Sequence, residues 1–405
     1  MSSILVLPGT KWQLELVKRI HDLGHEALVV SPEDNSPCKD LATDYFQSDI
    51  FDIDSIEQYA LRNHIEAVIS DECDIAMPVV AELGKRLGLN TLSAHDASLY
   101  TDKYQMRRFC TKNGLNTPKY RLCENLDDAK TFLRELGKTI IIKPLDSNAS
   151  HGVFTIENES DLEKLFDDTI SYSRTRKAVI AEEYIIGTEF TVDGIKTPLN
   201  HYTLAISEKK HFAHNKNIAY ELLFTHSSDK YDYDLLRQTN DDFVMKSGLR
   251  FGFTHGEYKY SNGKYYLIEI AARGGGNLIS ALITQYMSGY DTYKYLIDCS
   301  LGRQIPNNSS DFSIRSEYTN NASVLYFFQA PNGGGKVKRV RGIRNLINNT
   351  NILDYSLNFK CGDFIEDPKN DSVRIGYYIA GCKDKDSLTS TMNDVMREFA
   401  IDIDK

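Results

Sequence analysis

The segment GEYKYSNGKYYLIEIAARGGG, residues 256–276, decides the fold, because it predicts two long strands joined by a tight turn. A carboxylate stands on each strand, Glu257 on the first and Glu269 on the second. Side chains alternate between the two faces of a strand, so the turn length decides whether the carboxylates share a face. A three-residue loop, 261–263, keeps them on one face, whereas a two-residue Asn262-Gly263 turn of type I′ places them on opposite faces.

The metal role that we favour requires the carboxylates to share a face, as the three-residue loop allows. Glu257 then pairs with Leu267, and Glu269 is its diagonal neighbour at about 7–8 Å between Cα atoms. That separation suits two carboxylates sharing Mg²⁺ on nucleotide phosphates, because Mg²⁺ keeps several waters and takes few protein ligands. A purely structural pair is the alternative. It is disfavoured because Glu269 lies among apolar residues, where an unpaired carboxylate is costly.

An arginine and three glycines follow the second strand. The guanidinium of Arg273 beside bare backbone suits a carboxylate or an acyl phosphate, so we expect Arg273, Gly275 and Gly276 to bind substrate. The alternative is a salt bridge from Arg273 to Glu269 with a flexible glycine turn.

A candidate phosphate loop lies upstream, in IIIKPLDSNASHGV, residues 140–153. Lys143 ends an apolar strand, and small residues at 146–152 let backbone N–H groups approach phosphate oxygens closely. The order is not that of a Walker A loop. Taken alone, the segment favours a tight hairpin turn with a solvated lysine; the cofactor-binding candidates in it are Lys143, Ser147, Ser150, His151 and Gly152.

The strand VIAEEYIIGTEF, residues 179–190, carries glutamates in an apolar setting. Carboxylates there are costly unless they are paired or used. Glu182, Glu183 and Glu189 can accept hydrogen bonds from an adenine amino group or from ribose hydroxyls, and the backbone near Ile185 can read the adenine edge. An edge strand with solvated glutamates is an equally good interpretation.

The chain divides by pattern into three parts. Residues 1–95 alternate short apolar strands with helical spacings, which predicts a parallel sheet with helices on both faces, without a dinucleotide fingerprint. Residues 96–312 are typical of an α+β unit with hairpins, and Asn307–Ser310 looks like a linker. Residues 313–405 predict short strands and a terminal helix.

Composition excludes several classes of protein. The 47 basic and 57 acidic residues give a net charge of −10, which disfavours nucleic acid as a partner. The seven cysteines are scattered without a CxxC pair, which fits a reduced cytoplasm and disfavours zinc or disulfides. No apolar run has the length of a membrane span, and the N-terminus has no signal-peptide pattern, so we expect a cytoplasmic protein without membrane contact.

These segments, in this order, resemble the ATP-grasp superfamily, above all its carboxylate–amine ligases of the L-amino-acid ligase and carbamoyl-phosphate-synthase-like group. YTDKYQMRRFCTKNGLNTPKY, residues 100–120, resembles the entry helix of that group. The resemblance extends over roughly residues 1–380. It implies an ATP-grasp fold with an N-terminal Rossmann-like domain (1–95), two α+β lobes that hold ATP (96–312) and a small C-terminal β-rich domain (313–405).

The resemblance also implies roles for single residues. Lys103 and Lys143 contact phosphates, and Arg273 steadies an acyl phosphate. Mg²⁺, or Mn²⁺ in its place, is held by Glu257 and Glu269. The nucleoside is held by Glu182, Glu183, Ile185 and Glu189.

Two positions bear on the substrate and the metal. Related ligases bind the substrate amino group with a glutamate that would be Glu221 here, but the histidine expected three residues later is Phe224. Many relatives carry an asparagine or acid two residues after the second metal glutamate, and that position is Ala271. One Mg²⁺ would then be held more weakly or through more water.

The implied function is that of an ATP-dependent ligase. It would activate a carboxylate, of an amino acid or another small acid, as an acyl phosphate and couple it to an amine, releasing ADP and phosphate. The partners would be these small molecules, and a homodimer is the assembly that the resemblance suggests. Two alternatives stay open: a phosphotransferase whose phosphorylated substrate is the product, and a nucleotide-binding protein without catalysis.

Overall fold

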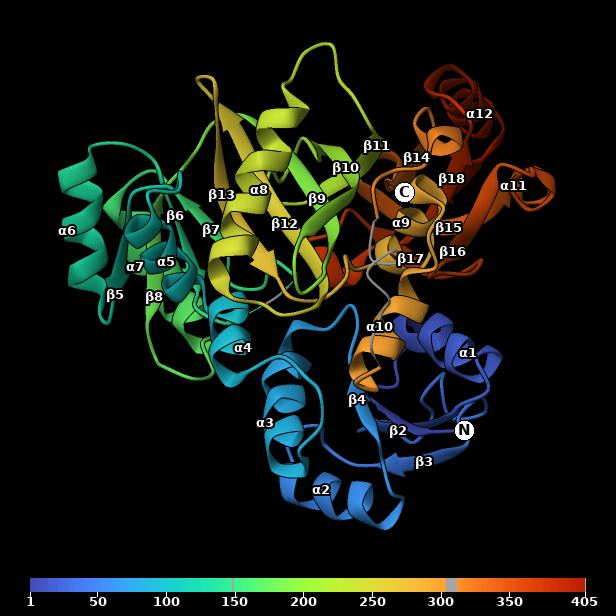
Figure 1. Cartoon of the computed structure of the whole chain (residues 1–405). Coiled ribbons are helices and arrows are strands. Elements are labelled where there is room, and N and C mark those ends of the chain that lie inside the picture. The colour runs from blue at the N-terminus through green and yellow to red at the C-terminus, as the bar shows by residue number, and fades with distance from the viewer. Residues whose placement is uncertain (148, 304–311, 405) are drawn as a thin grey trace.

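The computed structural model describes residues 1–147, 149–303 and 312–404. Figure 1 shows a large central sheet, a smaller sheet beside it and an N-terminal α/β unit below it. The expected linker Asn307–Ser310 lies outside the described residues. The α/β and α+β class predicted from the sequence is confirmed.

The N-terminal unit is a parallel sheet of order β3-β2-β1-β4. Alternate residues of β1 pack into two different cores, Ile4 and Val6 on the face of α1 and Leu5 on the face of α2 and α3, so helices cover both faces as predicted. The expectations missed β3, whose side chains are half-buried or exposed. The strands are β1 (Ser3–Val6), β2 (Glu26–Ser31), β3 (Asp44–Gln47) and β4 (Ala67–Ile69), and the helices are α1 (Leu14–Asp22), α2 (Ile53–Arg62) and α3 (Met77–Leu87).

Helices α4 (Ala94–Thr101) and α5 (Lys103–Asn113) lead into a small antiparallel sheet of order β5-β8-β6-β7. Its strands are β5 (Tyr120–Cys123), β6 (Ile140–Pro144), β7 (Phe154–Ile156) and β8 (Val179–Glu183). One face packs on α6 (Leu126–Leu136) and α7 (Glu159–Ser171), through Ile140 and Ile142 among others. The alternate residues Ile141 and Lys143 therefore face the other way, into a cavity.

The large sheet is antiparallel, with the order β13-β12-β9-β10-β11-β14-β18-β16. Its strands are β9 (Thr188–Lys196), β10 (His201–His211), β11 (Ala219–Thr225), β12 (Gly252–Ser261), β13 (Lys264–Ala271), β14 (Ala322–Phe327), β16 (Ile352–Leu357) and β18 (Gly376–Cys382). Strands from both sides of residue 312 thus share one sheet. The division into three domains stays a prediction.

Helices connect the large sheet to its surroundings. Helix α8 (Tyr233–Ser247) packs on β9 and β10, while η3 (Ile279–Ile283), α9 (Thr284–Ser288) and α10 (Thr292–Ser300) follow the hairpin. One buried cluster runs from β1 through α10 to β11 and β14, so it fixes the N-terminal unit against the sheet. At the C-terminal end, α11 (Ile343–Asn348), α12 (Lys385–Glu398) and a sheet of β17 (Phe364–Glu366), β15 (Gly334–Arg341) and β19 (Ala400–Asp404) complete the fold.

The hairpin of β12 and β13 corrects one expectation. Ser261 pairs with Lys264, so the turn is the two-residue Asn262-Gly263 type, with both φ angles positive, at 49° and 76°. The three-residue loop was wrong. The carboxylates nevertheless share a face, because a register shift at Glu257/Tyr258 leaves Ile268 as an extra residue and pairs Glu257 directly with Glu269.

Two expectations from composition can be compared with the described residues. Within them, no helix has the length and apolar character needed to cross a membrane. All seven cysteines are free thiols, and five of them are buried. Burial raises the pKa of the Cys38 thiol to about 12, as expected for a packing residue rather than a reactive one.

Candidate active site

A cavity of about 570 Å³ lies between the small sheet and the large sheet, and residues of the N-terminal unit line one end of it. Most of the predicted site residues come together here. The predicted residues that line the cavity are Lys103, Lys143, Ser147, Ser150, Glu182, Glu183, Ile185, Glu189, Glu257, Glu269, Arg273 and Gly276.

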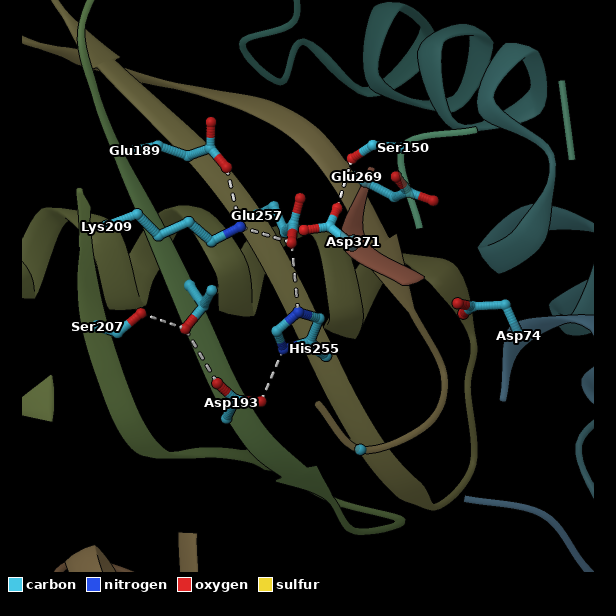
Figure 2. Close-up of polar contacts among 12 residues, drawn as sticks. Asp74, Ser150, Glu189, Asp193, Ser207, Lys209, His255, Glu257, Glu269 and Asp371 are labelled. Atoms are coloured by element: carbon cyan, nitrogen blue, oxygen red, sulfur yellow. Dashed lines mark hydrogen bonds and ion pairs between the residues drawn. The ribbon is translucent and has the colours of Figure 1, made fainter. Parts of the chain in front are cut away.

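The two hairpin carboxylates face the cavity side by side (Figure 2), and each is held by a lysine. Lys103 Nζ lies 2.9 Å from Glu269 Oε1, and Lys209 Nζ lies 2.7 Å from Glu257 Oε1. Among the described residues, the second oxygen of each carboxylate has no hydrogen-bond partner. Burial opposes ionisation of Glu257, but the charge of Lys209 and a hydrogen bond from His255 lower its pKa well below the usual range.

Lys209 on β10 contacts both Glu189, the expected ribose acceptor, and Glu257, the expected metal ligand. The sequence did not predict Lys209 as a site residue. Its ammonium donates to Glu189 Oε1 at 2.8 Å and to Glu257 Oε1 at 2.7 Å (Figure 2). Burial disfavours its charge, but the two carboxylates outweigh burial and raise its pKa. Lys209 therefore fixes the distance between the expected ribose acceptor and the expected metal ligand.

A second set of contacts holds Glu257 in position through His255 and Asp193. His255 Nδ1 lies 2.8 Å from Asp193 Oδ1, and its Nε2 lies 3.5 Å from Glu257 Oε1 (Figure 2). Burial opposes protonation of His255, but Asp193 and Glu257 together raise its pKa to about 9. A protonated imidazole thus holds the Glu257 carboxylate in place at neutral pH.

We predict that Lys209→Met weakens nucleotide binding about tenfold or more, because it removes a charge-assisted contact and leaves two carboxylates facing each other. Titration of a fluorescent ATP analogue at several Mg²⁺ concentrations measures this. The matched control is Lys210→Met, because the adjacent Lys210 is exposed and pairs with Glu221 outside the cavity. Equal affinities for the two variants would refute the role of Lys209.

Glu182 is committed to ion pairs. Its Oε1 lies 2.6 Å from Arg107 Nε and its Oε2 lies 2.8 Å from Lys143 Nζ, and the carboxylate is 1% exposed. Burial opposes its ionisation, but Arg107 and Lys143 outweigh burial and lower its pKa to about 2. Glu182 therefore orients Lys143, and among the expected nucleoside carboxylates Glu183 and Glu189 are the more open to a ligand.

The candidate phosphate loop is attached to a turn near the C-terminus, η7 (Asp371–Val373). Ser150 Oγ donates to Asp371 Oδ2 at 2.6 Å (Figure 2), and His151 Nε2 lies 3.0 Å from Ser372 Oγ. Ser147 and Ser150 line the cavity, but His151 and Gly152 do not. His151 stacks on Tyr172 instead, so its predicted contact with the nucleotide is not supported; Asn148 lies outside the described residues.

Arg273 lines the cavity, but its salt bridge differs from the one considered. Its Nε and second terminal nitrogen donate to Asp74 at 2.9 and 2.6 Å, in place of Glu269. Asp74 follows β4 in the N-terminal unit, so this pair joins that unit to the hairpin. Burial opposes the charge of Asp74, but Arg273 outweighs burial and lowers its pKa.

Of the glycines after Arg273, Gly275 packs closely against the side chains of Asp193 and His255. A Cβ on Gly275 would lie 2.6 Å from Asp193 Oδ1 and 2.8 Å from His255 Nδ1. Gly276 lines the cavity and Gly275 does not, so the position of Gly275 does not support its predicted substrate role. The absence of a side chain at Gly275 lets the segment approach the His255–Asp193 pair.

We predict that Gly275→Ala lowers stability by about 1–3 kcal/mol, because the added methyl group overfills this contact. A thermal shift measurement should give a midpoint several degrees below that of the parent. Gly276→Ala is the matched control, since a Cβ there meets nothing within 4 Å. A Gly275→Ala midpoint equal to that of the control would contradict the packing argument.

Glu221 is not brought to the site. Its carboxylate lies 2.7 Å from Lys210 Nζ, and it does not line the cavity, although its neighbours Ala219 and Leu222 do. Strand alternation explains this, because Leu222 faces the cavity and Glu221 consequently faces the opposite side of the sheet. The amino-group role of Glu221 therefore stays a prediction, which its position in the fold does not support.

The carboxylates fit a divalent cation held partly by phosphate and water. No group of three or more His, Cys, Asp or Glu side chains in the described part of the chain could hold a metal by itself. Two adjacent carboxylates with one uncommitted oxygen each nonetheless match the sparse protein ligation of Mg²⁺. Ala271 also lines the cavity and supplies no ligand.

Comparison with known proteins agrees with this geometry. Residues 136–281 match the ATP-grasp domain family. A formate-dependent phosphoribosylglycinamide formyltransferase of Methanococcus vannielii is 28% identical over 184 residues, which are 45% of this chain and 47% of that protein. That of Sulfurisphaera tokodaii is 27% identical over 192 residues, which are 47% of this chain and 48% of that protein. The chain thus spans about half the length of the curated relatives it matches.

Solved structures match over the whole chain. An L-amino acid ligase from Bacillus licheniformis superposes with a TM-score of 0.85 at 17% identity, covering 100% of this chain and 99% of that one. A phosphoribosylglycinamide synthetase from Anaerococcus prevotii superposes with a TM-score of 0.73 at 19% identity, covering 100% of both chains. The fold is therefore the ATP-grasp fold.

Proposed function

We propose that this chain, which contains an ATP-grasp domain, is an ATP-dependent ligase that activates a carboxylate as an acyl phosphate and couples it to an amine, releasing ADP and phosphate. One observation carries the proposal: Glu257 and Glu269 stand directly opposite each other, in the same cavity as Lys103, Lys143 and Arg273. Such a site offers cations for a triphosphate and carboxylates for the ions that accompany it.

The nucleotide would lie between the two sheets. Glu183, Ile185 and Glu189 would hold the nucleoside, while Lys103, Lys143 and the loop 146–152 would face the phosphates. Lys103 and Lys143 are both buried, at 3% and 5% exposed, so their charges act where water screens them little. Their present partners, Glu269 and Glu182, keep them in place without a ligand.

Glu257 and Glu269 would hold Mg²⁺, or Mn²⁺ in its place, and the ion would neutralise charge on the transferring phosphoryl group. The protein's own share of the chemistry is positioning. Arg273, fixed by Asp74, would face the carboxylate and the acyl phosphate made from it. The loop 146–152, attached to Asp371 and Ser372, would keep water from that intermediate.

Known proteins of this fold support the reaction class. Their names include a ligase of amino acids and a synthetase of phosphoribosylglycinamide. The curated relatives are formyltransferases that depend on formate, itself a carboxylate. For this chain, small-molecule substrates, a cytoplasmic location, a homodimer and the three-domain division are further parts of the proposal.

A screen in two steps tests the function. Amino acids and other small carboxylic acids are first offered with ATP, Mg²⁺ and hydroxylamine, which traps an acyl phosphate as a hydroxamate. Each acid that releases ADP is then offered with the amino acids as amines, and the product is identified by mass spectrometry. Hydroxamate together with amide supports the ligase, a stable phosphorylated product indicates a phosphotransferase, and binding without ADP release indicates a non-catalytic protein.

A further inference from the structure

One carboxylate at the cavity's N-terminal end has no counter-ion. Eight acidic residues line the cavity, namely Glu72, Asp74, Glu182, Glu183, Glu189, Glu257, Glu269 and Asp371. Seven of them have a lysine or arginine within 4.0 Å. Among the described residues, Glu72 has none. The ionised form of a carboxylate that is partly removed from water is stabilised when a cation binds beside it.

The position of Glu72 is fixed by its surroundings. It follows β4 in the left-handed region, with a φ of 55°, a conformation that costs a non-glycine residue free energy. Both carboxylate oxygens accept from Leu278 N–H at 3.1 Å, and Ser280 Oγ donates to Oε1 at 3.2 Å. These donors are neutral, so they orient the carboxylate without supplying a counter-ion.

The other charged groups near Glu72 have partners of their own. Arg273 is bound to Asp74 by two hydrogen bonds. The ammonium of Lys11 lies over the rings of Trp12 and Tyr377, at 4.3 and 5.9 Å from their centroids. Asp71, beside Glu72, is fully buried and accepts from Gly274, Ser280 and Tyr293. The missing cation is therefore not supplied by the described part of the protein.

We propose that the counter-ion of Glu72 is the ammonium group of the amine substrate, and that Glu72 accepts the proton which this amine must lose before it attacks. The inference rests on the proposed function and adds its base.

Four of the other cavity carboxylates are poorly suited to this step. Cations lower the pKa of Asp74, Glu182, Glu189 and Glu257 despite burial, which makes these groups weak bases. Burial, and then the charge of Asp71, raise the pKa of Glu72 well above its ordinary value. Glu72 is therefore a stronger base than these four carboxylates, and a general base is most effective when its pKa is close to the operating pH.

The ammonium gives one proton to the Glu72 carboxylate, and the nitrogen lone pair attacks the carbonyl carbon of the acyl phosphate. The C–N bond forms, the C–O bond to phosphate breaks, and its electrons leave with the phosphate. The nitrogen's second proton goes to that phosphate, and Glu72 later returns its proton to water.

Glu72→Gln tests the inference, because the amide keeps an acceptor for Leu278 but carries no charge. The variant is given an acid and an amino acid that the screen above identifies as a ligated pair, with hydroxylamine as a competitor. Hydroxylamine is a neutral amine near pH 7 and needs no base. The measured quantity is the ratio of amide to hydroxamate, which does not depend on the fraction of folded enzyme.

We expect this ratio to fall about tenfold or more relative to the parent and to rise again with pH, as bulk base supplies free amine. Glu66→Gln, an exposed glutamate just before β4, is the matched control and should keep the parent ratio. An unchanged ratio in Glu72→Gln, including a parallel loss of both products, overturns the inference. Absence of hydroxamate from the parent enzyme would instead overturn the proposed function.

Discussion

Glu269→Gln should lower ADP release by about 10³-fold or more, which corresponds to about 4 kcal/mol of transition-state stabilisation. The substitution keeps the size of the side chain but removes its charge. The amide is a weaker ligand for Mg²⁺, and Lys103 loses the carboxylate that lies 2.9 Å from its ammonium. Initial rates of ADP release with a saturating acid and hydroxylamine measure the effect.

Glu208→Gln is the control for this variant, because Glu208 lies on β10 beside Lys209 and does not line the cavity. Its rate should match that of the parent. Circular dichroism should show the same fold for both variants, since Glu269 is partly exposed, with 33% of its side chain accessible. A Glu269→Gln enzyme with the parent rate would exclude Glu269 as a metal ligand.

Arg107→Met should cost about 3–5 kcal/mol of stability, because it leaves a buried carboxylate with only part of its compensation. Arg107 is fully buried and donates to Glu182 Oε1 at 2.6 Å. It also donates to the carbonyl oxygen of Ile268 at 2.5 Å, at the bulge that brings Glu269 opposite Glu257. Loss of Arg107 therefore disturbs both the small sheet and the hairpin of β12 and β13.

Chemical unfolding followed by circular dichroism, with hydrogen exchange of β8 and β13, measures this effect. Arg108→Met is the matched control, since Arg108 is the next residue and is exposed, with its guanidinium 5.8 Å from the ring centroid of Tyr104. Its unfolding midpoint should stay near that of the parent. Equal midpoints for the two variants would contradict the role given to Arg107.

The sequence predicts the sheets well because their signals are local. Apolar strands such as 140–142 and the paired strands of 256–276 carry their own periodicity, and Lys143, Glu257 and Glu269 follow from position within those strands. Lys103 lies on helix α5 and was expected only from the family resemblance. The bulge at Ile268 is not local in this sense. It is stabilised by Arg107 from α5, more than a hundred residues earlier. The glutamates therefore share a face because of this bulge and not because of the three-residue loop on which the prediction depended.

The missed residues share a second cause, since their roles depend on contacts between distant strands. Lys209 meets Glu189 only because β10 lies beside β9. Asp74 meets Arg273 only because the N-terminal unit packs against the end of the hairpin. Glu221 was predicted at the site because a segment pattern does not say which face of the sheet a residue takes. One signal was readable: the acids of SDECD, 70–74, follow a buried strand at the carboxyl edge of a parallel sheet, where ligands commonly bind.

The path of a carboxylate oxygen tests the central claim most directly. An acid found in the screen is labelled with ¹⁸O in its carboxylate and converted to amide or hydroxamate with unlabelled ATP in unlabelled water. If an acyl phosphate forms in this cavity, each phosphate released carries one ¹⁸O from the acid, as mass spectrometry will detect. Phosphate released without label during product formation would contradict carboxylate activation by phosphoryl transfer.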